Sequence, residues 1–338
     1  MNRLLRLILR RLIISIPVLL IVVIGVFLLL NSAGGDAVDA YLAAMGGGDA
    51  ELAARLREQY GLDGSTFGRL MFTLGQLAQG NLGQSIALNR PIADVIAERL
   101  PNTLWLMGSA TAMSFVLGSA LGIVAGRRPG SASDRLLSGG SLLLYSVPSF
   151  WLGLVLSVAF AVQLRWFPVS GIETVASGKT GLARAADIAW HLVLPVTALG
   201  VIYLALFLRI MRSGMVEAWG QDYTLAARAR GLSGWRITLN HAARNALLPL
   251  ITMLGLQAAS MLGGSVVIES VFAIPGFGRL AQEAVAVRDA PLLMGVILVS
   301  ALMVILANLL VDLAYGLIDP RIGSNADGRP EGGGRRAA

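Results

Sequence analysis

The sequence contains no cysteine, only two histidines and few charged residues of any kind. The absence of cysteine excludes disulfides, thiolate metal sites and cysteine nucleophiles. His191 and His241 lie far apart in the sequence, which argues against a histidine metal cluster. Charged residues make up 14% of the chain, against about 25% in an ordinary soluble domain. Hydrophobic residues make up 55%, and the mean hydropathy is +0.70, so the composition indicates a chain built to lie in lipid.

The formal net charge of +7 would suggest nucleic-acid binding in a soluble protein. Here the excess is mostly arginine clustered at the ends of apolar runs, which is the pattern of the positive-inside rule. The sequence shows no basic face and no strand with interleaved aromatic residues. We therefore expect a lipid environment and no nucleic-acid partner.

Long apolar runs dominate the chain. A helix needs about 20 apolar residues to cross the hydrocarbon core of a bilayer. A basic stretch precedes the first run, so a cleaved signal peptide is the alternative there, but the run is longer than a signal-peptide core and five more follow. We predict an all-α membrane protein with six transmembrane helices, at about 12–30, 103–126, 136–164, 191–211, 246–268 and 291–317.

The distribution of lysine and arginine predicts the orientation. If the N-terminus is cytoplasmic, the segments on that side carry 17 such residues, against 5 in the short loops on the other side. The long loop 31–101 carries 5 more, but the rule is weak for long loops. Both termini are therefore predicted to be cytoplasmic.

The segments outside the membrane differ in character. In the loop 31–101, an acidic stretch at 49–58 has helical spacing of Leu52 and Leu56, which predicts a small folded hood on the outer face. The end of the chain is rich in Gly, Arg and Ala and has no apolar period, which predicts disorder. The predicted units are a first helix with its hood (1–96), a transmembrane core (97–317) and a cytoplasmic tail (318–338).

The predicted spans lack charge in their central parts; Glu269 and Asp312 lie only near span ends. Ion-coupled transporters and intramembrane proteases need ionisable groups within the membrane, so both classes are disfavoured. Lys179 lies in a Ser-Gly-Lys-Thr sequence that superficially resembles a phosphate-binding loop, but the first glycine of that motif is replaced by Glu173. Energy for transport must therefore come from another chain, and a stand-alone transporter or channel is the weaker alternative.

Small residues and one proline mark the second and third predicted spans. Gly118, Gly122 and Gly126 recur every four residues, which predicts close helix packing, with a pore-lining role left open. Pro148 interrupts the third span and predicts a kink there.

Between the fourth and fifth predicted spans lies the cytoplasmic segment 221–249. Ala226, Ala227 and Ala229 favour a short helix with a low profile, and Gly231 is placed to end it. Such a helix could insert into a groove of a partner protein, or it could be an ordinary amphipathic connector. Spacing alone does not separate these two interpretations.

The segment 221–249 resembles the cytoplasmic loop of permease subunits of ATP-binding-cassette (ABC) importers, and more narrowly the first permease of the dipeptide/oligopeptide/nickel group. Leu225 replaces the glutamate of the broad importer signature, a replacement common in this group. The resemblance covers nearly the whole chain, and further matching motifs are Arg10-Arg11-Leu12, Gln59–Asp63, Gly80–Ser85, Glu98–Thr103, Val147–Gly153, Glu269–Gly278 and Asp319–Arg321.

The resemblance implies a type I ABC importer permease fold. A second homologous permease would complete the translocation pathway, two ABC ATPases would dock beneath, and an extracytoplasmic binding protein would deliver substrate. The chain itself would be non-catalytic, without cofactor or metal. Peptides are the expected substrate, with nickel chelates, glutathione or opine-like solutes as alternatives. A coupling helix at about 222–232 would contact the ATPase through Tyr223, Ala226, Ala227, Arg228 and Gly231.

Overall fold

The computed structural model describes residues 3–32 and 64–318, with a few single positions between 38 and 57. Several predictions lie outside the described residues: most of the acidic stretch at 49–58, the motif at 59–63 and the tail from residue 319 onward. The structure therefore bears on the first helix, the end of the outer loop and the transmembrane core.

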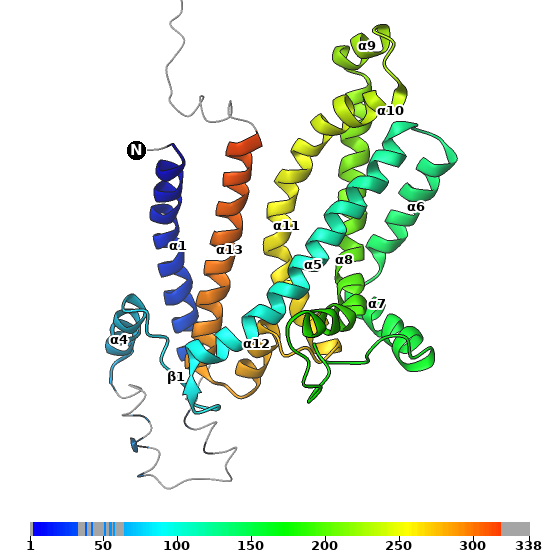
Figure 1. Ribbon diagram of the computed structural model, residues 1–338. Helices are drawn as coiled ribbons and strands as arrows, with labels where there is room; N and C mark the ends of the chain where they lie inside the picture. The colour runs from blue at the N-terminus through cyan, green and yellow to red at the C-terminus, as the bar shows by residue number, and fades with distance from the viewer. Residues whose placement is uncertain are drawn as a thin grey trace, which may run out of the picture.

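The described chain is predominantly helical (Figure 1). One short antiparallel ladder, which the all-α prediction did not include, joins β1 (Gln84–Ser85) to β2 (Arg90–Pro91). Two segments are π-helical, η1 (Ser157–Gln163) and η2 (Thr238–Ala243). The α-helices are α1 (Arg3–Ser32), α4 (Thr66–Ala78), α5 (Ile92–Arg127), α6 (Ala132–Ser146), α7 (Ser149–Leu156), α8 (Gly181–Trp219), α9 (Asp222–Ala229), α10 (Gly234–Ile237), α11 (Arg244–Val271), α12 (Phe277–Ala286) and α13 (Ala290–Ile318).

Four helices of the described chain are long and apolar enough to cross a membrane: α1, α5, α8 and α13. A fifth candidate is the pair formed by α6 and the run from α7 through η1, if the two are counted as one span. The predicted span 246–268 lies within α11, a helix of 28 residues that is not among these candidates. The structure thus supports a multi-pass membrane protein, and the count of six spans stays a prediction.

The third predicted span is broken rather than mildly kinked. Helix α6 ends at Ser146, α7 begins at Ser149, and the two are bent by 98°. Pro148 precedes α7 directly, and Val147 before it has an extended backbone with φ −88° and ψ 126°. Proline disfavours the helical conformation in the residue that precedes it, which explains why the first helix stops here.

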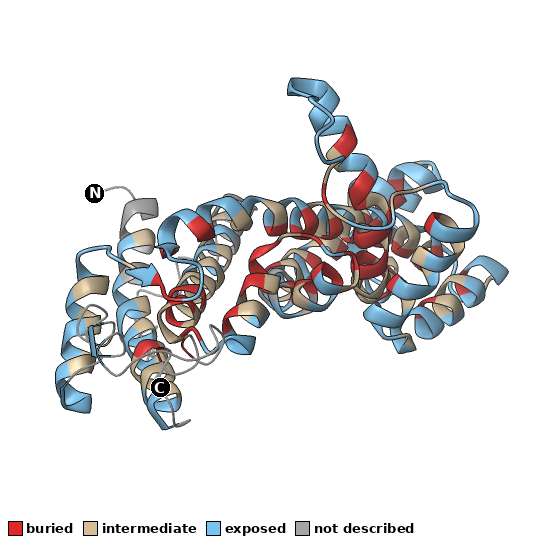
Figure 2. Cartoon of the chain, turned by 90° about the horizontal axis from the view of Figure 1, so that it is seen from below, coloured by how far each residue is buried: buried red, intermediate tan, exposed pale blue. Residues whose placement is uncertain are grey.

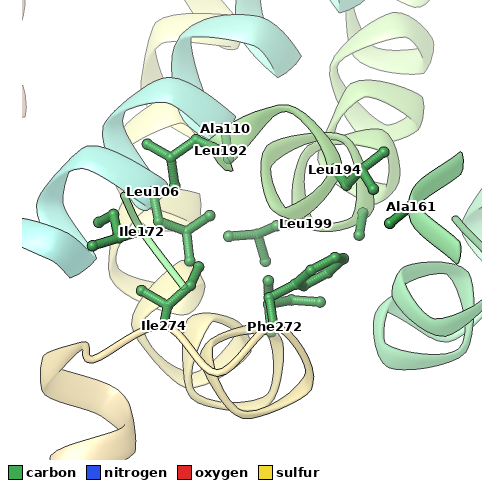
Figure 3. Packing of buried hydrophobic residues seen from close by; sticks show 11 residues of the cluster. Leu106, Ala110, Ala161, Ile172, Leu192, Leu194, Leu199, Phe272 and Ile274 are labelled. Atoms are coloured by element: carbon green, nitrogen blue, oxygen red, sulfur yellow. The ribbon is translucent and has the colours of Figure 1, made fainter. Parts of the chain in front are cut away.

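Helix α8 forms the centre of the core, whereas α1 lies at its edge. In the most apolar stretch of each helix, 61% of the residues are buried in α8 and only 6% in α1. In Figure 2 the buried residues gather in the middle of the molecule, and the peripheral helices are mostly exposed. One packed cluster joins Leu106 of α5, Leu199 of α8 and Phe272, which directly follows α11 (Figure 3). Helix α1 therefore contributes little to the core, and part of its apolar surface is exposed.

Candidate functional site

Helix α9 stands at one end of the molecule, beyond the end of α8 (Figure 1). The chain leaves α8 at Trp219, forms α9 and returns through α10 and η2 into α11. This end carries the predicted coupling segment, so the local structure of α9 decides which residues a partner could reach.

The inner face of α9 is fixed by a threonine and an alanine. Thr224 and Ala227, three residues apart, are both buried. The Thr224 hydroxyl Oγ1 donates to the carbonyl oxygens of Trp219 at 3.1 Å and Gln221 at 2.8 Å as alternative partners. Thr224 thereby ties the first turn of α9 to the end of α8.

Gly231 lies just after α9, where the chain turns. Its φ is +75°, in the left-handed region that glycine adopts without steric cost. Its N–H donates to the carbonyl of Arg228 at 2.9 Å, and the N–H of Leu232 donates to that of Ala227 at 3.3 Å. A Cβ at Gly231 would meet no atom within 4 Å, so backbone conformation rather than space favours glycine here.

The exposed surface of α9 includes an apolar patch of low profile beside the charged residues Asp222 and Arg228. Leu225 is 52% exposed, and Ala226 and Ala229 are exposed beside it. Of the five residues predicted to contact an ATPase, Tyr223, Ala226, Arg228 and Gly231 are exposed, but Ala227 points inward and is 4% exposed. Ala227 can therefore support α9 but offers almost no surface to a partner.

Two arginine–tryptophan contacts hold this end of the molecule together. The Arg228 guanidinium lies 4.8 Å from the centre of the Trp219 ring, joining α9 to α8. The Arg127 guanidinium lies 4.0 Å from the centre of the Trp235 ring, joining the end of α5 to α10. A cation and the face of an aromatic ring attract each other electrostatically. Neither Arg127 nor Trp235 was predicted from the sequence, although an arginine at the end of an apolar run and a tryptophan in the segment 221–249 were available signals.

The glycine stripe of α5 lies directly against α8. A Cβ at Gly118, Gly122 or Gly126 would come within 2.5–2.7 Å of the Cβ of a larger side chain on α8. Real Cβ atoms are essentially never that close, so any larger residue would force the helices apart. In this structure the stripe is packed against α8, and the facing residues are Phe207, Met211 and Met215.

An ion pair joins α6 to α8 near the same end. Arg212 Nη2 lies 2.8 Å from Asp134 Oδ2, and Arg212 Nε also donates to Asp134 Oδ1. The Asp134 side chain is 4% exposed and also accepts from the backbone N–H of Gly130 at 2.8 Å. Helices α5, α6 and α8 are thus tied together directly beneath α9. This pair was not predicted from the sequence, because its members are 78 residues apart.

At the opposite end, Glu269 is fully buried although it lies at the end of an apolar run. Thr103 Oγ1 donates to its Oε1 at 2.6 Å, and the backbone N–H of Arg279 donates to its Oε2 at 2.8 Å. A Cβ at Gly276 would lie 2.3 Å from this carboxyl group. Glu269 therefore joins α11, the start of α12 and α5, a role that its sequence position did not indicate.

Lys179 has a structural partner at this end. Its Nζ lies 2.5 Å from Asp187 Oδ1, and Asp187 also accepts from the N–H of Thr174 at 2.6 Å. Beside it, Arg184 donates two hydrogen bonds to Glu173 and lowers the pKa of that carboxyl group. Across the described residues, no group of three or more His, Cys, Asp or Glu side chains could hold a metal ion.

Comparisons with known proteins agree over most of the chain. A model of the family described as "Binding-protein-dependent transport system inner membrane component" matches residues 118–324. The oligopeptide transport system permease protein AppB of Bacillus subtilis is 36% identical over 320 residues, covering 93% of this chain and 98% of its own. A putative peptide permease protein of Brucella ovis is 40% identical over 322 residues, covering 94% and 99%.

A solved structure shares the fold. An inward-facing structure of the MetNI methionine ABC transporter matches with a TM-score of 0.54 at 17% identity, covering 67% of this chain and 96% of the matched chain. The family model spans more than half of the sequence, and the curated relatives align along nearly all of it. The chain belongs to the family of binding-protein-dependent transport system inner membrane components.

Proposed function

We propose that this chain is the permease subunit of an ATP-driven peptide importer, and that separate ATPases act on it through α9. The observation that carries the coupling role is the exposed, low-profile face of α9 beyond the end of the long helix α8. The names of the relatives support peptides as the substrate over nickel chelates, glutathione or opine-like solutes. In this proposal ATP hydrolysis belongs to the partners and the chain is non-catalytic.

The proposed assembly has this chain in a bacterial inner membrane with six spans and both termini in the cytoplasm. It pairs with a second homologous permease, binds two ABC ATPases at the α9 end and receives substrate from an extracytoplasmic binding protein at the other. The transmembrane core is 97–317, preceded by the first helix and hood (1–96) and followed by the tail (318–338). The fold shared with the chain of an ABC transporter supports this arrangement.

The contacts around α9 suggest how movement passes into the membrane. A partner would contact Leu225, Ala226 and Ala229 on the outer face, while Thr224 and Ala227 hold the inner face to the chain. Because α5, α6 and α8 are tied together beneath α9, displacement of α9 would move these helices as a unit. ATP binding would then favour one of two arrangements of the spans through its different affinity for each.

The docking role is tested by a bulky substitution on the outer face. Ala226→Trp adds volume where a partner must approach closely, without disturbing the buried face of α9. The matched control is Ala132→Trp, at an exposed position where α6 begins, near the same end of the molecule. We expect the assembled complex with Ala226→Trp to lose at least about tenfold in substrate-stimulated ATP hydrolysis, and the control to retain it. Normal stimulation with Ala226→Trp would contradict the docking role.

The turn at Gly231 is tested by two substitutions with different backbone preferences. Asparagine tolerates the left-handed region, whereas a β-branched residue such as valine does not. If the glycine serves the turn, Gly231→Asn should keep most of the stimulated ATP hydrolysis and Gly231→Val should lose it. Equal loss in both variants would show that the partner needs the bare glycine surface instead.

As a check on the subunit assignment, the purified chain alone should hydrolyse no ATP.

A further inference from the structure

Helix α4 exposes an apolar face that nothing in the described chain covers. From Phe67 to Ala78, every exposed residue is apolar or glycine. Phe67 is 69% exposed, Phe72 53% and Met71 44%, and α4 has no fully buried residue. The single charged residue of the helix, Arg69, is less exposed than these three. An exposed face with two phenylalanines and no charge is unfavourable in water.

The position of α4 is fixed by a contact with the end of α1. Arg69 Nη2 donates a hydrogen bond to Oδ1 of Asn31, which lies one residue before α1 ends at Ser32. Figure 1 shows α4 beside this part of α1, far from α9. Only 6% of the apolar stretch of α1 is buried, and Ile21 and Leu29 are 71% and 70% exposed. We therefore expect α1 to lie in lipid, with its end at Asn31–Ser32 near the edge of the bilayer.

We propose that α4 lies on the membrane surface at the end opposite α9, with Phe67, Met71 and Phe72 inserted into the boundary between headgroups and acyl chains. Helix α4 lies beside the end of α1 at the edge of the molecule, where the main helix contacts of α1 are with α13 and α4 (Figure 1). Interfacial helices use this combination of aromatic and aliphatic side chains on one face. Lipid is thus the occupant that the neighbouring surface already requires.

The absence of cysteine makes a direct test straightforward. Met71→Cys introduces a single labelling site on the α4 face, and the full chain carries an environment-sensitive fluorophore there. The matched controls are Ile21→Cys in α1, which is 71% exposed, and Val175→Cys in the loop at the α4 end, which is 91% exposed. Each variant is reconstituted into phosphatidylethanolamine–phosphatidylglycerol vesicles and quenched by aqueous iodide or by lipids with a nitroxide near the headgroup or deep in the acyl chain.

We expect the Met71→Cys label to be quenched more by the shallow nitroxide than by the deep one, and several-fold less by iodide than the Val175→Cys label. The Ile21→Cys label should prefer the deep nitroxide. Iodide access equal to that at Val175 would overturn the proposal. Protection from both iodide and nitroxide would also overturn it, because protein, such as residues 33–63 or a partner subunit, would then cover the face. Phe72→Cys provides a second site if Met71→Cys fails to fold, as judged by thermal unfolding.

Discussion

At the scale of single residues, Gly122 lies where α5 and α8 are in close contact. A Cβ there would lie 2.5 Å from the Cβ of Met211 and 2.7 Å from the carbonyl oxygen of Leu208. We predict that Gly122→Ala lowers stability by about 1–3 kcal/mol, because the added methyl group must separate two packed helices. Gly108→Ala is the control on the same helix, since its Cβ would meet nothing within 4 Å.

The measurement for Gly122 is the midpoint of thermal unfolding in detergent. Gly108→Ala should leave the midpoint unchanged or raise it, because alanine favours a helix by up to about 1 kcal/mol over glycine. Equal effects of the two substitutions would contradict the close approach of α5 and α8 at Gly122.

Glu269 gives a second prediction at this scale. Glu269→Ala leaves Thr103 Oγ1 and the N–H of Arg279 without their acceptor in a buried site. Each unsatisfied buried group costs about 1–3 kcal/mol, so we expect a clear loss of thermal stability in detergent. Glu98→Ala, which removes an exposed carboxylate paired with Arg90, is the control and should change the midpoint little.

For these residues, the sequence predicted contacts that depend on spacing within one helix, but not contacts with distant parts of the chain. The four-residue spacing of the glycine stripe predicted close packing, because helix geometry alone puts such residues on one face. Glu269 gave no comparable signal, since its partner Thr103 is 166 residues away and an acidic residue at the end of a span is ordinarily solvated. The inward direction of Ala227 was equally hidden, because it depends on how α9 packs against the rest of the chain.

At the scale of elements, the Asp134–Arg212 pair decides how firmly α6 is held to α8. Arg212→Leu leaves the buried Asp134 carboxylate without its cation, and breaking such a pair costs about 3–5 kcal/mol. We predict a large fall in the unfolding midpoint for Arg212→Leu and partial recovery in the double variant Asp134→Asn/Arg212→Leu. The exposed pair Arg90–Glu98 is the reference, for which a double-mutant cycle should give a coupling of about 0–1 kcal/mol.

Additive effects of the Asp134 and Arg212 substitutions would contradict a direct interaction between these two side chains. Full helical content with a lowered midpoint would show that the loss lies in packing rather than in secondary structure.

The long helices α1, α5, α8 and α13 followed from the sequence, because one apolar run makes one helix. Their boundaries followed only for α13, since α1, α5 and α8 begin at Arg3, Ile92 and Gly181, well before the predicted spans. Boundaries were also missed where backbone geometry intervenes. Pro148 predicted a kink, but the 98° bend also depends on where α7 packs, against α8 and α11. The π-helical segments η1 and η2 and the short β1–β2 ladder left no pattern in the apolar spacing.

At the scale of the whole molecule, the orientation in the membrane is open to a direct test. The loop before α8, which contains Val175, and helix α9, which contains Tyr223, lie at opposite ends of the molecule (Figure 1). Both side chains are exposed, so each position can carry a single cysteine. We predict that an impermeant maleimide labels Val175→Cys in intact spheroplasts, and that Tyr223→Cys reacts only after the membrane is permeabilised. Labelling of both from the same side would overturn the charge-based orientation, and the opposite pattern would invert it.

Helix α8 is longer than the hydrocarbon core of a bilayer is thick. Its 39 residues correspond to a length of about 58 Å, and the hydrocarbon core is about 30 Å thick. Helix α9 follows at its end, so a protein that never enters the bilayer can touch it.

The glycine stripe has a mechanical consequence for such a long helix. On both α5 and α8 the facing residues repeat every four positions, a step of about 6 Å along each axis. The side chains of α8 therefore pack into the gaps at the glycines of α5. If one helix slid a small distance along the other, Met211 or Met215 would clash with the α5 backbone between two glycines. A force applied at one end of α8 is therefore transmitted to α5 along the glycine stripe, and the two helices are expected to tilt together rather than slide past each other.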